Sequence, residues 1–509
     1  METHIKLKYD SIEEIRTKIN ILRETNKKQK LYDINYRKKQ LNILRASLLK
    51  YEKEIHESNN KDLRQNEFNS ELVSFNIVLQ DIDFTLKHID SWTARRSVDL
   101  PIMFAPGKSY IVPEPYGVCL VMSSWNVQYS TLLQPIVQAI SAGNCVLAKP
   151  SEMAAESAYV CQKILAELDP EIVQVVQGDA PQCIELLRNQ FDVILFTGSP
   201  IKGRLIAEAA AKFLTPCILE LGGQNPTIVD SNCNLKNAAY NIVYGRFMQS
   251  GQVCLSPEYI LIDAKIHKEF IELLKITTSE FFNGNAKTSD DYTRIINEFH
   301  TKRLVDLIQN CPKQNLIYGG NFDIKDKYIE PTIFSFESIL ALKDINLSKD
   351  EIFGPILYTA PYNNIEECIE YINSKDKPLA LYYFGSNSEN KNLIEKKTSS
   401  GAFVCNDAVV HFTSHYLPFG GVGKSGISAY HGKFGFDNLS HLKPVLDRKE
   451  MLLPLRYPPY TDGKKKVMRF AMKSLNTTQG KVAHSLVMFI VLFAFYYFMP
   501  SIRNFLTPQ

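Results

Sequence analysis

Residues 117–152 have the sequence GVCLVMSSWNVQYSTLLQPIVQAISAGNCVLAKPSE. Short apolar runs at 117–122 and 145–148 predict two buried strands, and residues 132–142 predict a helix that ends at Gly143. A strand, a helix and a second strand at this spacing indicate a βαβ unit, in which the two strands lie parallel in one sheet. The stretch therefore predicts an α/β fold.

The same alternation extends along most of the chain. A second α/β region is expected at 231–410, and the first hundred residues have helical spacing that begins with a capping-box pattern at Ser11 and Glu14. Sheets of this kind bind ligands beyond the carboxyl ends of their strands. Further strands are predicted at 172–176, 193–196, 217–221, 227–229 and 379–384, and further helices at 154–168, 201–213 and 266–274.

Composition narrows the class of protein. The chain has 509 residues, more than one compact core usually accommodates, and its apolar share of 45% and charged share of 22% are typical of a folded protein. The ten cysteines form no Cys-x-x-Cys pair and no cluster with histidine at metal-ligand spacing, so no metal site is predicted. No apolar signal-peptide core begins the chain, which favours reduced thiols in a protein that faces the cytosol.

The charge is unevenly distributed. Seven basic and no acidic residues follow Asp462, so a tail of +7 is joined to a body of −4. This pattern argues against a nucleic-acid partner and favours an anionic membrane surface. Residues 482–502 carry no formal charge unless His484 is protonated. Their 21 positions are enough to cross a hydrocarbon core of about 30 Å.

We therefore expect a transmembrane tail anchor at 482–502, preceded by a basic linker at 446–481 that stays on the cytosolic side. The membrane of the endoplasmic reticulum, the outer mitochondrial membrane and the surroundings of lipid droplets fit equally well. A terminal helix that docks on the protein body or in a dimer contact is the alternative interpretation.

Four motifs come directly after predicted strands. In the first, Ser124-Trp125-Asn126, the amide of Asn126 can donate a hydrogen bond to an oxyanion that develops during a reaction. In the second, Lys149 and Glu152 can bracket a ribose, and the carboxylate would repel a 2′-phosphate, which favours NAD over NADP. Taken alone, each of these two motifs is explained equally well as a set of ordinary loop residues.

The third motif, FTGSPIKG at 196–203, runs from a strand into a helix. Its Gly198, Ser199 and Gly203 would bring backbone N–H groups close to a pyrophosphate. The fourth pairs Glu220 with Cys254, which follows 34 positions later after a glycine. A thiol beside a glycine turn can be activated as a thiolate, and a carboxylate can serve as a base. A buried structural cysteine is the ordinary interpretation of a single thiol.

Together, and in this order, the motifs resemble the aldehyde dehydrogenase superfamily, most closely its class 3 fatty-aldehyde members. The resemblance covers about residues 10–460. Departures occur at Val127-Gln128, which borders the substrate tunnel of the family, and at Gln224-Asn225. Other matching segments are 142–144, 214–216, 250–254, 351–355, 417–423, 426–440 and 456–460.

The resemblance implies an aldehyde dehydrogenase fold in several parts. These are a Rossmann-like NAD-binding domain (1–98 and 117–227), an α/β catalytic domain (228–410) and a strand extension (99–116 and 411–445) that builds a homodimer. The basic linker and the transmembrane helix complete this organisation.

It also implies a mechanism. Cys254 attacks the aldehyde, while the amide of Asn126 and the backbone N–H of Cys254 hold the oxyanion. Glu220 activates the water that releases a carboxylic acid. For the cofactor, it implies that Glu351 and Phe353 bind the nicotinamide ribose, that Lys149 and Glu152 bind the adenosine ribose, and that Gly198, Ser199 and Gly203 lie near the pyrophosphate.

The membrane tail favours long-chain aldehydes, which partition into bilayers at roughly 0.8 kcal/mol per methylene. Smaller aromatic aldehydes remain open as substrates. A CoA-acylating or phosphate-releasing reaction on the same fold would need no base at Glu220. A non-catalytic membrane-bound binding protein is the remaining alternative, and the intact Asn126, Glu220 and Cys254 argue against it.

Overall fold

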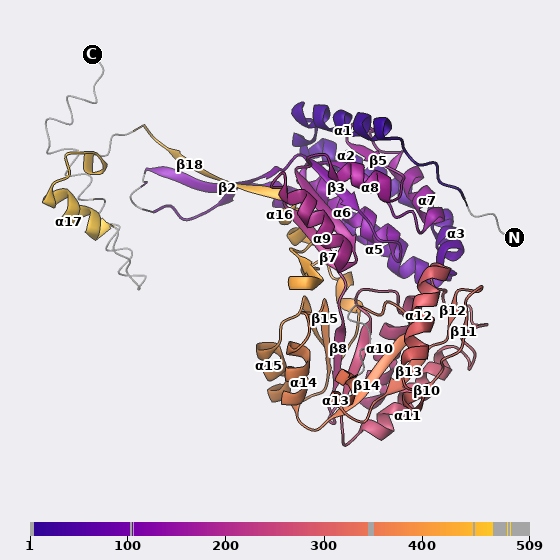
Figure 1. The fold of residues 1–509 in the computed structure, drawn as a ribbon. Coiled ribbons are helices and arrows are strands. Elements are labelled where there is room, and N and C mark those ends of the chain that lie inside the picture. The colour runs from indigo at the N-terminus through magenta and orange to yellow at the C-terminus, as the bar shows by residue number, and fades with distance from the viewer. Residues whose placement is uncertain are drawn as a thin grey trace, which may run out of the picture. The chain divides into compact units, whose positions relative to one another are not determined.

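A computed structural model describes residues 5–101, 104, 106–344, 351–450 and 454–471, together with Leu486 and Phe489. The chain divides into two compact units. The larger unit comprises Met1–Thr93 and Glu114–His441, and the smaller comprises Ala94–Pro113 and Leu442–Gln509. Within the larger unit, the magenta and the orange parts of the ribbon each contain a sheet (Figure 1).

The first sheet has five parallel strands and one antiparallel edge strand. The residues of its central strands β3 and β4 are buried along their whole length, because helices cover both faces of such a sheet. The strand order is β17 (Gly426–Ile427), β7 (Cys217–Leu221), β6 (Val193–Gly198), β3 (Val118–Met122), β4 (Cys145–Lys149) and β5 (Val173–Val175).

The second sheet has seven strands, and only its edge strand β10 runs antiparallel to its neighbour. A two-stranded ribbon of β11 (Phe322–Asp323) and β12 (Tyr328–Ile329) accompanies it. The strand order is β10 (Leu316–Tyr318), β13 (Thr332–Ser335), β14 (Ile356–Tyr362), β9 (Pro257–Asp263), β8 (Asn225–Val229), β15 (Ala380–Phe384) and β16 (Ala402–Cys405).

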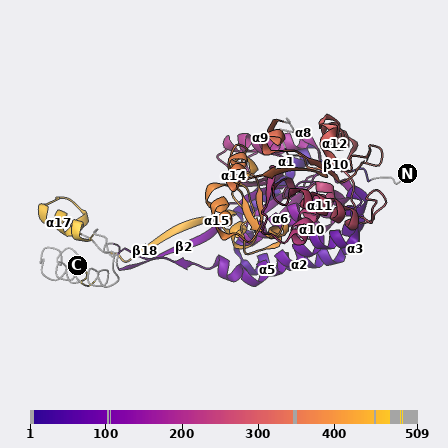
Figure 2. The same cartoon turned by 90° about the horizontal axis from the view of Figure 1, so that it is seen from below.

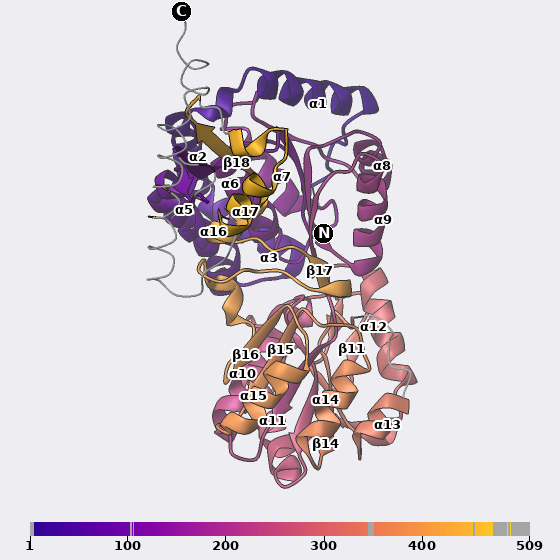
Figure 3. The ribbon, with the colours of Figure 1, turned by 90° about the vertical axis from the view of Figure 1, so that its left-hand side faces the viewer.

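Helices surround both sheets. α2, α3 and α5 form a row along one side of the larger unit (Figure 2), and α8 and α9 lie beside each other (Figure 3). The main helices are α1 (Ile12–Lys27), α2 (Ile34–Lys50), α3 (Glu52–Leu63), α5 (Ile77–Thr93), α6 (Gln128–Ala142), α7 (Ala155–Leu165), α8 (Ala180–Leu187), α9 (Pro200–Ala211), α10 (Leu235–Phe247), α11 (His267–Phe281), α12 (Glu298–Asn310), α13 (Ile339–Asp344), α14 (Ile365–Asn373), α15 (Ser388–Lys397) and α16 (Gly432–Asn438).

The predicted βαβ unit is confirmed as β3, α6 and β4, whose strands pair in parallel. Gly143 ends α6 with a φ of +95°, and a Cβ there would lie 2.6 Å from the guanidinium of Arg37. Glycine is required at this position for both reasons. The predicted capping box also forms at the start of α1, where Ser11 and Glu14 exchange hydrogen bonds.

Two boundaries differ from the prediction. The strand at residues 225–229 joins the second sheet, so the sheets divide between Leu221 and Asn225 and not after residue 227. Residues 411–441 belong to the larger unit, because Gly426–Ile427 pairs with the strand that carries Glu220. Helix α8 was not predicted, since its apolar spacing covers barely two turns.

The smaller unit contains most of a three-stranded sheet of β1 (Arg96–Ser97), β2 (Gly107–Pro115) and β18 (Ser440–Arg448). Helix α17 (Asp462–Ala471) follows it. None of the helices formed by the described residues is both long and apolar enough to span a bilayer. The predicted transmembrane segment at 482–502 lies outside the described residues, apart from Leu486 and Phe489.

Candidate active site

Cys254 and Glu220 meet at the centre of the candidate site. Glu220 belongs to β7, and Cys254 follows the short helix η4 (Met248–Gly251) in the loop before β9. The thiol of Cys254 lies close enough to the carboxyl group of Glu220 for each to shift the pKa of the other. The two residues that the sequence separates by 34 positions are therefore in contact.

The site is electrostatically unusual. Burial raises the pKa of Glu220 to about 7, so this carboxyl can gain or lose a proton near neutral pH. Burial, together with the nearby carboxylates of Glu220 and Glu351, raises the pKa of the Cys254 thiol well above its usual range. The thiol therefore keeps its proton until a base accepts it, and Glu220 is the base in contact with it.

Asn126 is tied to the same loop. Its Oδ1 accepts a hydrogen bond of 2.7 Å from the Ser124 hydroxyl, and its Nδ2 donates one of 2.7 Å to the carbonyl of Gln252. The side chain of Gln249 donates in turn to the carbonyl of Asn126 at 3.0 Å. A primary amide has two N–H groups. One therefore holds the cysteine loop, and the second can serve an oxyanion beside Cys254.

The backbone before Cys254 has a left-handed conformation. Gln249, Ser250 and Gly251 have φ values of +53°, +51° and +69°. Two of them are not glycine, so this turn is strained and must be maintained by its surroundings. Such strain is common where a reactive side chain must be presented in one orientation.

Two residues that sequence reasoning missed fix the carbonyl groups of this loop. The Nδ2 of Asn225 donates to the carbonyl of Cys254 at 2.7 Å and to that of Ser256 at 3.1 Å. The hydroxyl of Tyr382 donates to the carbonyl of Leu255 at 2.7 Å. Asn225 lies in a departure from the family pattern, and that departure was the available signal.

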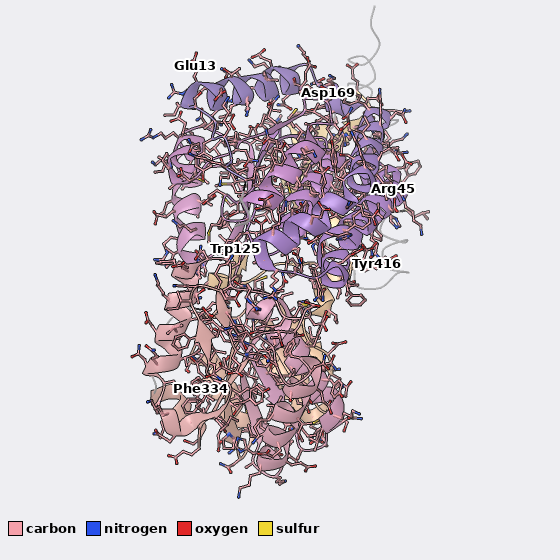
Figure 4. The ribbon with its side chains drawn as sticks, turned by 90° about the vertical axis from the view of Figure 1, so that its right-hand side faces the viewer. Glu13, Arg45, Trp125, Asp169, Phe334 and Tyr416 are labelled. Carbon is pink, nitrogen blue, oxygen red and sulfur yellow. The ribbon has the colours of Figure 1, made fainter. Side chains whose placement is uncertain are left out.

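Glu351 lies near the nucleophile, and Phe353 packs against the tryptophan that precedes Asn126. A Cβ on Gly222 would lie only 1.7 Å from a carboxyl oxygen of Glu351, so this glycine is required for the approach of the carboxylate. Phe353 packs edge-on against Trp125, with ring centroids 5.3 Å apart. Trp125 lies where the purple and the pink parts of the ribbon meet (Figure 4).

A second group of predicted residues lies at the carboxyl end of β4. Lys149 is buried and forms an ion pair with the half-buried Glu152. The charges of Lys149, Glu152 and Lys202 all act on the thiol of Cys183 in α8, which brings this pair close to α8 and α9. The pair thus lies at the sheet edge where a nucleotide is expected to bind.

The glycine-containing motif at residues 196–203 has two separate functions in the fold. Gly198 ends β6, and the hydroxyl of Ser199 caps the first turn of α9 by accepting the N–H of Lys202 at 3.4 Å. Gly203 lies one turn further on, where a Cβ would come within 2.6 Å of Leu221. Its small size thus lets α9 pack closely on β7.

These residues fit a dinucleotide. The start of α9 offers backbone N–H groups of the kind that bind phosphate, and Lys149 with Glu152 offers polar partners for a ribose. On the adjacent helices, the apolar side chains of Ile184 and Ile201 are 54% and 63% exposed, which suits the faces of an aromatic base.

Among the described residues, Glu52, His56 and Glu71 form a group with ligand atoms close enough to hold a metal ion. None of the three belongs to the predicted site. The ten cysteines are all free in the structure.

The model of the aldehyde dehydrogenase family matches residues 2–445. The chain belongs to this family. The mouse protein "Aldehyde dehydrogenase family 3 member A2" is 37% identical over 482 residues, which are 93% of this chain and 96% of that protein. The dog protein "Aldehyde dehydrogenase, dimeric NADP-preferring" is 39% identical over 84% of this chain and 93% of its own.

Solved structures of aldehyde dehydrogenases agree. The substrate-bound AldH of Staphylococcus aureus superposes with a TM-score of 0.87, at 34% identity, over 90% of this chain and 99% of that one. The predicted α/β fold and the resemblance to class 3 aldehyde dehydrogenases are thereby confirmed. The enzyme is an oxidoreductase that acts on aldehydes with a nicotinamide cofactor.

Proposed function

We propose that this enzyme oxidises medium- and long-chain fatty aldehydes to carboxylic acids with NAD. The observation that carries the proposal is the close approach of the buried Glu220 carboxyl group to the Cys254 thiol, in a loop that Asn126 holds by a hydrogen bond to Gln252. A nucleophile, a base and an oxyanion donor thus come from three separate parts of the chain. The likeness to the mouse family 3 member A2 protein supports aldehyde oxidation, and the apolar C-terminal segment supports long-chain aldehydes as the substrate class.

In the proposed reaction, Glu220 takes the proton of Cys254 and the sulfur bonds to the aldehyde carbon. The carbonyl oxygen becomes an oxyanion held by Asn126 and by the backbone N–H of Cys254. The bound cofactor supplies the hydride acceptor, so the carbon leaves this step as a thioester. After Glu220 has released the thiol proton to solvent, its carboxylate deprotonates a water molecule, whose oxygen displaces the sulfur as a thiolate and releases the acid.

For the cofactor, we assign the nicotinamide ribose to Glu351 with Phe353 beside it, and the adenosine ribose to Lys149 and Glu152. The phosphates are assigned to the backbone around Gly198 and Ser199, with Gly203 allowing α9 to approach. Glu152 favours NAD because its carboxylate would repel a 2′-phosphate. The dog relative is named NADP-preferring, so the preference must be measured.

We further propose that residues 482–502 anchor the enzyme in a membrane, with the catalytic unit in the cytosol. The charge pattern supports this, because seven basic residues and no acidic ones follow Asp462. The endoplasmic reticulum, the outer mitochondrial membrane and lipid-droplet surroundings are the candidate locations. We also propose a homodimer, which fits the word "dimeric" in the name of the dog relative.

The purified enzyme, supplied with hexadecanal or benzaldehyde and NAD, tests the proposal by the rate of NADH formation. A higher kcat/KM for hexadecanal supports a fatty-aldehyde substrate, whereas a higher value for benzaldehyde favours the aromatic alternative. Product analysis with and without CoA separates the reaction classes: acyl-CoA in place of free acid would refute hydrolysis by Glu220. Full activity of Cys254→Ala would refute the nucleophile.

A further inference from the structure

Side chains from other parts of the chain hold the segment Glu351–Gly354 by its backbone. The carboxylate of Glu258, in β9, accepts a hydrogen bond from the N–H of Ile352. The guanidinium of Arg246, in α10, donates to the carbonyl of Gly354. Arg303 in α12 donates to the carbonyl of Ile352 at 2.6 Å.

Arg246 also holds the first residue of β9, three positions after the nucleophile. Its second terminal nitrogen donates to the carbonyl of Pro257 at 3.0 Å. The two loops touch directly as well, because a Cβ on Gly251 would lie 2.2 Å from the carbonyl oxygen of Gly354. One guanidinium therefore joins the backbone just after Cys254 to the backbone just after Phe353.

The energetic cost of this arrangement indicates a role other than stability. Arg246 and Glu258 are 1% and 2% exposed. The Nε of Arg246 and one carboxyl oxygen of Glu258 are buried without a hydrogen-bond partner within the described structure. Buried charges with unsatisfied atoms cost free energy, and apolar side chains of similar size often stabilise a core better. The hydrogen bonds that these two residues do make go to the segment Glu351–Gly354 and to the start of β9, directly after the Cys254 loop.

We propose that Arg246 and Glu258 are positioning residues that fix the cofactor-binding segment Glu351–Gly354 in register with the Cys254 loop. Arg246 acts on both loops, whereas Glu258 acts on the cofactor-binding segment alone. The inference rests on the proposed assignment of Glu351 to the nicotinamide ribose. Neither residue is expected to touch the substrate or the cofactor.

Two activities separate these roles. NADH formation from hexadecanal needs both loops, whereas hydrolysis of 4-nitrophenyl acetate without cofactor needs only the thiol and its base. In the full-length enzyme, Glu258→Leu should raise the KM for NAD about tenfold and lower ester hydrolysis less than threefold. Arg246→Met should lower both activities at least tenfold, and Arg246→Lys should recover part of each.

Glu258→Gln keeps an oxygen that can accept the N–H of Ile352, so its KM for NAD should lie between those of the wild type and Glu258→Leu. It also provides the test if the leucine variant does not fold. Arg45→Gln, at an exposed ion pair with Asp83, is the matched control and should leave both activities unchanged. Thermal unfolding of every variant shows whether the fold is retained.

Glu351→Gln distinguishes the two ways in which the idea can fail. If this variant binds NAD as the wild type does, the proposed cofactor site is wrong. If it binds NAD weakly but folded Glu258→Leu and Glu258→Gln keep the wild-type KM, the positioning role of Glu258 is wrong. Equal loss of both activities in folded Glu258→Leu would also overturn it, as would wild-type ester hydrolysis in Arg246→Met.

Discussion

Gly251 faces the carbonyl group of Gly354, and a Cβ on Gly251 would come within 2.2 Å of that oxygen. Gly251 also has a φ of +69°, a backbone angle that residues other than glycine rarely adopt. The residue three positions before the nucleophile is thus constrained both by its own backbone and by the cofactor-binding segment. Any side chain at this position must displace one of the two loops.

Gly251→Ala should therefore lower kcat for NADH formation about 100-fold, because a shift of roughly 1 Å in a reacting group has effects of that size. Gly463→Ala is the control, since a Cβ there meets no atom closer than 3.8 Å. Thermal unfolding and steady-state rates are compared for both variants. Wild-type activity in a folded Gly251→Ala enzyme would show that the packing of the two loops is unimportant.

The pH dependence of the rate should report Glu220. Its pKa is raised to about 7 by burial, and only the ionised form can accept a proton. kcat/KM should fall about tenfold per unit as the pH decreases below 7. In Glu220→Gln, the residual rate should lose this acidic limb, and an unchanged limb would assign the ionisation to another group.

The same carboxyl should affect stability in the opposite direction. Because the pKa of Glu220 is higher in the folded protein than its ordinary value of 4.5, ionisation is disfavoured in the folded state. Its contribution to the free energy of unfolding should be largest below pH 4.5 and should decrease as the pH rises to about 7. Urea unfolding at pH 5 and pH 8 should show a smaller difference for Glu220→Gln than for the wild type.

Asn126→Ala should lower kcat about 100- to 1,000-fold, as is usual when an oxyanion donor is removed. The KM for the aldehyde should change much less, since the charge forms only during the reaction. Asn42 is exposed on α2, and the substitution Asn42→Ala provides a control of the same type. A loss confined to KM would indicate that Asn126 only helps to bind the substrate.

Glu152→Ala should shift cofactor preference towards NADP. Removing the carboxylate removes its repulsion of a 2′-phosphate and frees Lys149 from its ion pair. We expect the ratio of kcat/KM for NADP to that for NAD to rise about tenfold, which corresponds to roughly 1.4 kcal/mol. An unchanged ratio would place the adenosine ribose elsewhere.

Deletion of residues 482–509 should release the enzyme from membranes without loss of activity. Sedimentation with phosphatidylcholine–phosphatidylserine vesicles measures the first effect, and NADH formation from hexadecanal measures the second. Undiminished sedimentation of the shortened protein would contradict the tail anchor.

Local patterns predicted the fold well wherever the physical signal is local. The strand at 117–122, the helix after it and its end at Gly143 follow from apolar spacing and from the freedom of glycine, which act over a few residues. The predicted boundary between the first two domains fell inside the strand at 225–229. The strands at 217–221 and 225–229 look alike in sequence, although they pair in different sheets.

The candidate site was only partly predictable. Cys254, Glu220 and Asn126 occur in recognisable motifs, and the structure brings them together. Asn225, Arg246 and Glu258 act through contacts with the backbone of distant segments, which no short pattern records. The visible signs were the departure from the family pattern at Asn225 and the charges of Arg246 and Glu258 within otherwise apolar segments.

The strand that carries Glu220 acquires its outer neighbour, β17, from residues 426–427. During synthesis on the ribosome, more than two hundred residues must emerge after Glu220 before that neighbour exists. A nascent or prematurely terminated chain that stops before Gly426 would contain the thiol and its base with one flank of the strand open to water. The enzyme should therefore gain its activity only at the end of translation.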